Sequence, residues 1–333
     1  MDGKPQNDNL RSSPNYSRGS FQNLSPTPVM APDVSYIKVL KDVLSRPAGI
    51  KPSQPLPSIA TDLKSLRSEQ PVVIWFGHSS YLIHCRGVNI LVDPVFSGYA
   101  SPIPGMVKAF PGSDVYQVED LPEIDFVFIT HDHYDHLDKS TIRKLRPKAF
   151  YTSLGVGNRL DRFSMSDSAI HELDWWQSIS VSEDIQLIAT PARHFSGRGL
   201  KRGGSLWSSF VLKIFGYTLF LGGDSGYGDH FKDIGTKHGP FDLAILECGQ
   251  YNTSWPLIHM MPEETIQASI DLQAKVMMPV HWGKFALANH IWNEPVARAH
   301  KASLAAGVKI TTPLIGEPVI VGQPYPSKIW WDL

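Results

Sequence analysis

The chain has 333 residues, of which 42% are hydrophobic, and its formal net charge is -1. This length and composition predict a folded protein with a substantial core, and the charge gives no electrostatic case for binding nucleic acid. Two cysteines make a disulfide framework improbable and favour a reducing compartment. No apolar run reaches about eighteen residues, so a transmembrane segment is excluded, and without an apolar signal core the default location is cytoplasmic.

The N-terminal part of the chain differs in composition from the rest. Residues 1–35 are rich in Asn, Ser, Pro and Gly, which predicts a disordered extension. Within residues 36–70, apolar side chains recur at helical spacing from Tyr36 to Leu44, and a proline-rich linker follows from Lys51 to Ser58. We expect this helix and linker to pack on the main domain, which would span residues 71–333. The alternative is a helix that faces a partner or a lipid surface.

Three predicted strands then follow one another closely. Val72–Phe76, Tyr81–Cys85 and Val88–Val92 are rich in β-branched and aromatic residues and are separated by turn residues. Asp93 ends the third strand, and a carboxylate there needs a partner: it either supports a metal-ligating histidine or caps a helix or turn. His78, after the first strand, is interpreted as a hydrogen-bonded structural histidine in preference to a ligand.

The most informative stretch follows the apolar run Phe126–Ile129. Within six residues it contains His131, His133, Asp135 and His136. Imidazole nitrogens and carboxylate oxygens are the ligands that zinc and similar divalent ions take, and a turn at a strand's end can direct several of them into one cavity. Two pairs of ligands in one loop suggest two neighbouring ions. The alternative is a solvated polar loop that happens to be rich in histidine.

The remaining elements alternate between strand and helix. Helices are expected at Thr141–Leu145, Gly155–Phe163, Pro262–Ala274 and Glu294–Ala306, and strands at Ala149–Thr152, Ile185–Thr190, Trp207–Phe215, Tyr217–Leu221, Leu243–Leu246, Val276–Val280 and Pro318–Val321. This alternation predicts a layered α/β fold.

Single candidate ligands recur just beyond three of these later strands. They are His194, Asp224 and His281. Together with the first motif they complete a set for two ions: His131, His133 and His194 on one ion, Asp135, His136 and His281 on the other, and Asp224 bridging both. Each ion keeps a position for a shared water, as catalysis requires. These donors suit zinc best, although manganese, iron and nickel accept them too.

This ligand set resembles that of the metallo-β-lactamase superfamily. Motifs that resemble the branch containing N-acyl phosphatidylethanolamine phospholipase D lie at Gly77–Ser79, Leu91–Pro94, Thr130–Asp138, Glu172–Trp176, Gly239–Leu243 and His281–Asn289. The resemblance runs from about Val72 onward. It implies a four-layer αββα sandwich for residues 71–333, with the two-metal site at the strand ends and a helical or disordered extension before it.

The resemblance also implies an activity. A hydroxide that bridges two zinc ions would attack a phosphodiester, such as an N-acyl phosphatidylethanolamine-type phospholipid, and Asp135, Asp224 and His259 are the expected catalytic residues. His259 matches a substrate-contacting position of the branch, with a surface-loop histidine as its alternative. Lys139 and Ile258 depart from the phospholipase pattern, which has tyrosine and a polar residue there. Peripheral contact with a membrane is compatible with such a substrate.

Two other functions use the same residues. In the first, the hydroxide attacks a carbonyl carbon, which gives a lactonase or esterase whose small substrate carries a phosphate received by basic residues: Lys139, Arg193, Arg198, Lys201 and Arg202. In the second, the protein binds metal without catalysis. The sequence gives no oligomeric state.

Overall fold

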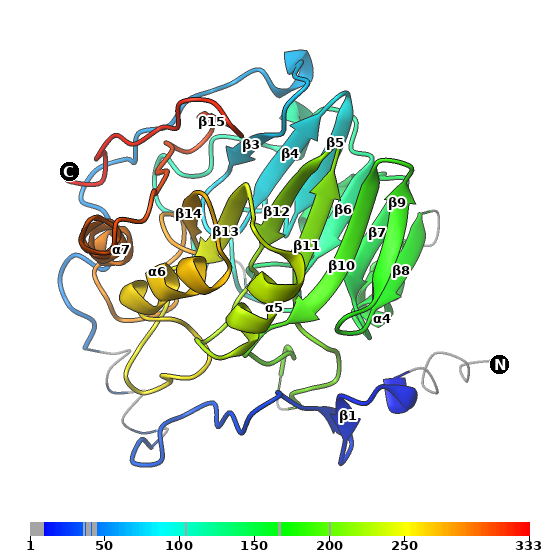
Figure 1. The fold of residues 1–333 in the computed structure, drawn as a ribbon. Coiled ribbons are helices and arrows are strands. Elements are labelled where there is room, and N and C mark those ends of the chain that lie inside the picture. Colours follow the sequence, from blue (N-terminus) through cyan, green and yellow to red (C-terminus); the bar gives the residue numbers. More distant parts are fainter. Residues whose placement is uncertain are drawn as a thin grey trace.

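Two β-sheets packed face to face form the centre of the molecule (Figure 1). The computed structural model describes residues 10–35, 37, 41, 45–103, 105–165, 168–199 and 201–333. In this part of the chain one sheet has seven strands and the other has six. The central strands of both sheets are buried on both faces, which explains why these strands are nearly continuous apolar runs in the sequence.

The seven-stranded sheet has the order β15-β3-β4-β5-β6-β7-β8. Its strands are β3 (Val72–Trp75), β4 (Tyr81–Cys85), β5 (Val88–Val92), β6 (Phe126–Ile129), β7 (Ala149–Ser153), β8 (Ala169–Leu173) and β15 (Pro318–Ile320). Pairing is antiparallel from β15 to β5 and parallel from β5 to β8. The parallel strands bring their carboxyl ends to one edge of the sheet.

The six-stranded sheet has the order β14-β13-β12-β11-β10-β9. Its strands are β9 (Ser178–Ser182), β10 (Ile185–Pro191), β11 (Ser208–Ile214), β12 (Tyr217–Leu221), β13 (Leu243–Glu247) and β14 (Met277–Val280). The strands β12, β13 and β14 are parallel, and β9 to β12 are antiparallel.

Helices cover the outer faces of the two sheets. The helices α3 (Lys139–Lys144) and α4 (Gly157–Arg162) contribute Ile142 and Leu160 to a core cluster with the outer face of the first sheet. The second sheet is covered by α5 (His230–His238), α6 (Pro262–Asp271) and α7 (Glu294–Ala306). Two short 3-10 helices lie elsewhere in the chain, at Leu63–Ser65 and Val118–Asp120. The layers are thus helix, sheet, sheet, helix, and the predicted αββα sandwich is confirmed.

Side-chain alternation along one strand shows how these layers are held together. In β5, Ile90 and Val92 belong to the core between the sheets, while Leu91 packs outward beneath the helical layer. Adjacent residues of a strand point to opposite faces, so a strand buried on both sides needs apolar residues at every position.

Residues 10–35, the described part of the N-terminal segment, contain regular structure that the composition did not indicate. Residues 16–17 and 20–21 form the short strand pair β1 (Tyr16–Ser17) and β2 (Ser20–Phe21), and Leu10 and Phe21 are buried against Trp175 and Trp207. Residues 1–35 contain few apolar residues, but two of these, Leu10 and Phe21, pack against the aromatic side chains of the domain. The expected helix Tyr36–Leu44 lies almost entirely outside the described residues. Among the helices described, none has the length and apolar content needed to cross a membrane.

Candidate metal centre

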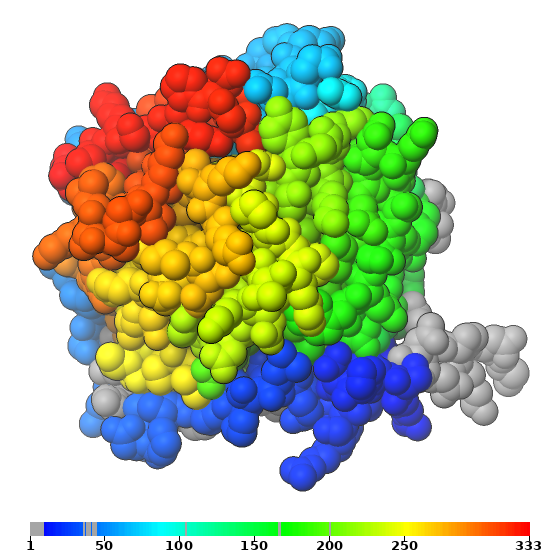
Figure 2. Space-filling model, viewed as in Figure 1, coloured from blue at the N-terminus to red at the C-terminus, as the bar shows by residue number. Residues whose placement is uncertain are grey.

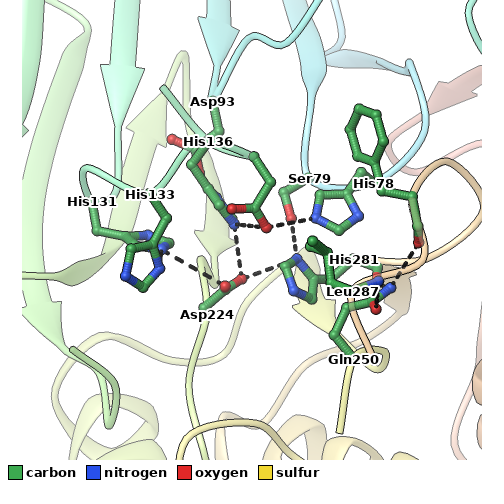
Figure 3. A network of polar contacts seen from close by, with 12 residues as sticks. His78, Ser79, Asp93, His131, His133, His136, Asp224, Gln250, His281 and Leu287 are labelled. Atoms are coloured by element: carbon green, nitrogen blue, oxygen red, sulfur yellow. Dashed lines mark hydrogen bonds and ion pairs between the residues drawn. The ribbon is translucent and has the colours of Figure 1, made fainter. Parts of the chain in front are cut away.

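Seven side chains predicted as metal ligands meet at one edge of the two sheets. Figure 3 labels His131, His133, His136, Asp224 and His281 among them. Four follow β6 directly, while the others follow β10, β12 and β14: His131, His133, Asp135 and His136, then His194, Asp224 and His281. All are buried apart from His133, which is half-buried. The ligands therefore come from both sheets. Their convergence is the geometric condition for the predicted site, and their role as ligands stays a prediction.

The first group of donors contains three imidazoles. His133 Nδ1 lies 2.9 Å from His131 Nε2 and 3.3 Å from His194 Nε2. Asp224 Oδ2 is 3.7 Å from both His131 Nε2 and His194 Nε2. One donor atom from each of these residues lies within 4.8 Å of the others. This group contains the three histidines predicted for one ion, together with the predicted bridge.

The second group lies on the other side of Asp224. Asp224 Oδ1 is 3.2 Å from His136 Nε2 and 3.1 Å from His281 Nδ1. Asp135 Oδ2 is 3.6 Å from His136 Nε2 and 3.0 Å from Nε2 of His78, a residue that we did not predict as a ligand. The two oxygens of Asp224 therefore face different groups of donors, as a bridging carboxylate requires.

The donor set fits divalent ions. Zinc binds imidazole nitrogen at about 2.0–2.1 Å in tetrahedral sites, which places neighbouring donors about 3.3 Å apart, close to the spacings within the first group. Two buried atoms at the centre, His136 Nε2 and Asp224 Oδ1, lie 3.2 Å apart as an ion pair, yet neither has a hydrogen-bond partner. Buried polar atoms normally have a partner, and a cation between the donors would provide one.

Other buried groups fix the orientation of the rings. Asp93 Oδ2 lies 2.8 Å from His136 Nδ1 and accepts a hydrogen bond from the Thr130 hydroxyl at 2.6 Å. The Ile258 carbonyl is 2.8 Å from His194 Nδ1, the ring nitrogen that faces away from the first donor group. The Ser79 hydroxyl is 2.9 Å from His281 Nδ1, the same nitrogen that faces Asp224 Oδ1. Asp93 thus contacts a candidate ligand, which is the first of its two predicted roles, and such partners set the tautomer and angle of ligating histidines.

The backbone around the site is strained. Four non-glycine residues there have positive φ angles: His78 at 54°, Asp93 at 41°, Gln250 at 62° and His281 at 67°. Each such conformation costs about 1–3 kcal/mol and persists only where surrounding structure enforces it. Gln250 supplies part of that enforcement, because its amide oxygen accepts hydrogen bonds from the backbone N–H groups of Leu287 and Ala288, both at 2.9 Å, in the loop after His281 (Figure 3).

Electrostatics of the cluster favour neutral imidazoles. Burial, reinforced by neighbouring imidazoles, holds the pKa values of His131, His194 and His281 well below the usual value. Burial also acts against protonation of His136, but three carboxylates outweigh it and its pKa is raised. Burial raises the pKa of Asp224 to about 6. Neutral imidazole is the form that binds a metal, so most histidines of the cluster are already in the protonation state that coordination requires.

A cavity of about 180 Å³ opens onto these groups. Its walls include His133, Asp135, His194, Asp224 and His281 together with Phe195, Gln250, Trp255, Ile258, His259 and Leu287. His259 Nδ1 lies 2.6 Å from Glu247 Oε2, and the His259 ring stacks on that of His281. His259 therefore borders the same cavity as the candidate ligands, where it was expected to contact substrate.

The basic residues considered for a phosphate site do not gather at this cavity. Arg193 donates hydrogen bonds to Thr27 Oγ1 and the Tyr227 carbonyl, and Arg198 binds the carbonyls of Asp132, His133 and Leu137. Lys139 borders a different cavity with Arg198, and Arg202 borders a third. No lysine or arginine is among the described residues that line the cavity at the candidate ligands.

Some residues of the site were not predicted from the sequence. His78 was interpreted as structural, although its position directly after a strand is the same signal that identified His194 and His281. Gln250 and Ser79 gave no signal, because an amide or a hydroxyl in a loop has many ordinary roles.

Comparison with known proteins agrees with this geometry. Residues 88–282 match the beta-lactamase superfamily domain. An uncharacterised protein of Mycobacterium tuberculosis is 39% identical over 330 residues, which cover 96% of this chain and 88% of that protein. The N-acyl-phosphatidylethanolamine-hydrolyzing phospholipase D 1 of Caenorhabditis elegans is 31% identical over 232 residues, 64% of each chain.

A solved structure shows the same fold. Igni18, a metallo hydrolase from Ignicoccus hospitalis, superposes with a TM-score of 0.59 at 20% identity, covering 77% of this chain and all of that one. The predicted family is confirmed by these matches. The chain belongs to the beta-lactamase superfamily as a metal-dependent hydrolase, in a branch that resembles N-acyl phosphatidylethanolamine phospholipase D.

Proposed function

We propose that this protein hydrolyses a phosphodiester with the help of two divalent metal ions, which we infer to be zinc. The observation that carries the proposal is Asp224, whose two carboxylate oxygens each lie within 3.7 Å of a different group of histidines. One group is His131, His133 and His194, and the other is His136 and His281 with Asp135. If only one ion bound, one of these two groups of donors would have no metal to coordinate.

The chemistry follows from these groups. When bound, two divalent ions would lower the pKa of a shared water toward neutrality and neutralise negative charge on the phosphoryl oxygens. Asp224 sets the separation of the two donor groups, and Asp93 holds the His136 ring in place. His259 Nδ1 lies 2.6 Å from Glu247 Oε2, and burial raises the pKa of Glu247 well above its usual value while it lowers that of His259. A protonated Glu247 would donate to Nδ1, so the neutral His259 ring would carry its proton at Nε2. This N–H group would donate a hydrogen bond to the departing oxygen as the phosphorus–oxygen bond breaks.

The choice of a phosphodiester rests on the relatives and on the cavity. Relatives from Caenorhabditis elegans and Saccharomyces cerevisiae, 31% and 32% identical, are named as hydrolysing N-acyl phosphatidylethanolamine. Phe195, Trp255, Ile258 and Leu287 give the cavity an apolar side that suits a lipid substrate. A lactonase acting on a phosphorylated substrate would need a basic pocket, which the described cavity walls do not provide. A cytoplasmic location and peripheral membrane contact stay predictions.

The test combines metal analysis with turnover. Purified protein should contain close to two ions per chain, and the zinc-loaded form should cleave bis-p-nitrophenyl phosphate and release phosphatidic acid from N-acyl phosphatidylethanolamine. Cleavage of lactones or carboxyl esters with no turnover of either phosphodiester would overturn the proposal.

A substitution ties turnover to the donors. Asp135→Ala removes a carboxylate of the second group and should lower turnover at least about a hundredfold, since ligands act as a unit, while leaving the fold formed. The matched control is Asp229→Ala, because Asp229 is exposed at the start of α5 and its side chain makes no capping hydrogen bond. Retained activity in Asp135→Ala would contradict the two-metal mechanism.

A further inference from the structure

The N-terminal segment lies against the loops that carry the candidate ligands. We name residues 13–31 the N-terminal strap; Figure 2 shows it, in blue, running along the lower edge of the molecule against the parts drawn in green and yellow. Nothing in the sequence of this segment suggests a role in the site. Its contacts, however, go to the loops after β8, β10 and β13 and to the segment before β11.

One strap residue binds directly to a candidate metal ligand. The Asn23 side-chain amide donates a hydrogen bond to the His194 carbonyl at 2.8 Å and accepts one from the His194 backbone N–H at 3.1 Å. The same Asn23 oxygen accepts a third hydrogen bond from Trp207 Nε1 at 3.1 Å. Asn23 therefore pairs with the His194 backbone as a neighbouring strand would, and Trp207 fixes the direction of the amide.

The two sides of His194 are thus held by different parts of the chain. Asn23 holds its backbone, and the Ile258 carbonyl holds its ring at Nδ1. These constraints leave Nε2 directed toward His133 Nδ1, 3.3 Å away. A ligand ring that is fixed at both the backbone and the far nitrogen has little freedom to turn away from the first donor group.

Further contacts keep the strap in position. Arg193 Nε donates to Thr27 Oγ1 at 3.0 Å, the Phe21 N–H donates to the Gly203 carbonyl at 2.9 Å, and the Ala31 N–H donates to the Ser254 carbonyl at 2.9 Å. Ser254 precedes Trp255, a wall of the cavity at the candidate ligands. The strap also forms one side of a cavity of about 610 Å³ that reaches His194 from outside.

We infer that the strap is a working part of the metal centre, and that Asn23 is a positioning residue which sets metal affinity in the group of His131, His133 and His194. The inference rests on the proposed two-metal function. The strap is polar and lies far from the candidate ligands along the chain. Its sequence alone therefore gives no indication of this role.

The test compares two neighbouring residues of the strap. Asn23→Ala should weaken binding of one of the two ions by about tenfold or more, as loss of a ligand's hydrogen-bond partner does, and leave the other ion unaffected. Gln22→Ala is the matched control, because the Gln22 side chain bonds only to Ser17 and Ser20 within the strap. Binding is measured by zinc competition with a chelator, and by visible absorption of cobalt-loaded protein, which reports geometry at each ion.

The outcomes separate this inference from the proposed function. Equal zinc affinities and an unchanged cobalt spectrum in Asn23→Ala would overturn the inference even if wild-type protein binds two ions and cleaves phosphodiesters. A single ion in the wild type would contradict the two-metal proposal, and the effect of Asn23→Ala on that ion would still decide the role of Asn23. If Asn23→Ala does not fold, Thr27→Val, which breaks the bond to Arg193, should show a smaller loss at the same ion, and no loss would contradict the inference.

Discussion

At the scale of single residues, the site depends on partners that orient the ligands as much as on the ligands. Asp93 is the clearest example: it is 1% exposed, has a positive φ, and binds Thr130 and His136. The sequence left two roles open for it, because a strand-end carboxylate can cap a turn or support a ligand. Only the fold shows which histidine lies opposite.

Asp93→Asn tests this support. The asparagine keeps the shape and tolerates the left-handed backbone, but it loses the negative charge opposite His136 Nδ1. We expect metal affinity at the second donor group, and turnover with it, to fall about 10–100-fold. Zinc competition with a chelator measures the affinity, and Asp184→Asn, an exposed change between β9 and β10, serves as the control. Unchanged affinity would show that His136 needs no carboxylate behind it.

The candidate ligands could be selected from the sequence, whereas most of their partners, Asp93 apart, could not. A histidine or aspartate just past an apolar run is visible in the sequence, so His194, Asp224 and His281 could be selected before their proximity was known. Asn23 could not be selected, because one asparagine in a polar segment of residues 1–35 differs in no way from its neighbours until the fold brings His194 beside it.

At the scale of elements, strands with buried faces were the most predictable. β5, β6 and β13 are short apolar runs that match the predicted ranges closely, whereas β8 and β9 were missed. β9 lies at the edge of its sheet and alternates exposed and half-buried residues. Its sequence is Ser-Ile-Ser-Val-Ser, so every second residue is a serine. An edge strand buries too little apolar surface to impose a strong pattern on its sequence.

A buried lysine joins the loop that carries His281 to two other stretches near the site. Lys284 is 1% exposed, and its Nζ donates to the carbonyls of Phe76 at 3.3 Å and Val95 at 3.1 Å while lying 3.1 Å from Asp114. It connects the loop after His281 with the segments that follow β3 and β5. One cation thus links three stretches of chain near the site.

Lys284→Met should be strongly destabilising for that reason. It leaves two buried carbonyls without a donor and Asp114 without its cation, at a cost on the order of 3 kcal/mol in the free energy of unfolding. Urea denaturation measures the loss. Lys309→Met, an exposed change beside Tyr325, should alter that free energy by less than about 0.5 kcal/mol. Similar values for the two variants would contradict the linking role of Lys284.

At the scale of the whole molecule, stability of the metal-free protein should depend steeply on pH. Burial lowers the pKa of six imidazoles at the site: His78, His131, His133, His194, His259 and His281. Above the ordinary histidine value of 6.5, these rings are neutral in both the folded and the unfolded chain. Below it, the unfolded chain takes up protons that the folded chain does not, so unfolding becomes more favourable as the pH falls.

Three buried groups at the site act in the opposite direction without reversing this trend. Folded His136 has a raised pKa and adds no loss below pH 6.5. Asp224, with a pKa of about 6, and Glu247, whose pKa burial raises well above its usual value, bind a proton in the folded state. We expect the free energy of unfolding of chelator-treated protein to fall by on the order of 5 kcal/mol between about pH 7.5 and about pH 5.5. Urea denaturation at both values measures it, and an equal stability would show that the cluster is not buried in the metal-free state.

The origin of the ligands in both sheets has a consequence for biosynthesis. Each donor group needs residues from the first sheet and from the second, so a growing polypeptide on the ribosome cannot complete either group from its earlier half. The first group closes only when Asp224 has been made, and the second waits for His281. Ions captured in this order would arrive late, after the sheet containing β3 to β7 has emerged, and metallation would act as a final check on correct assembly.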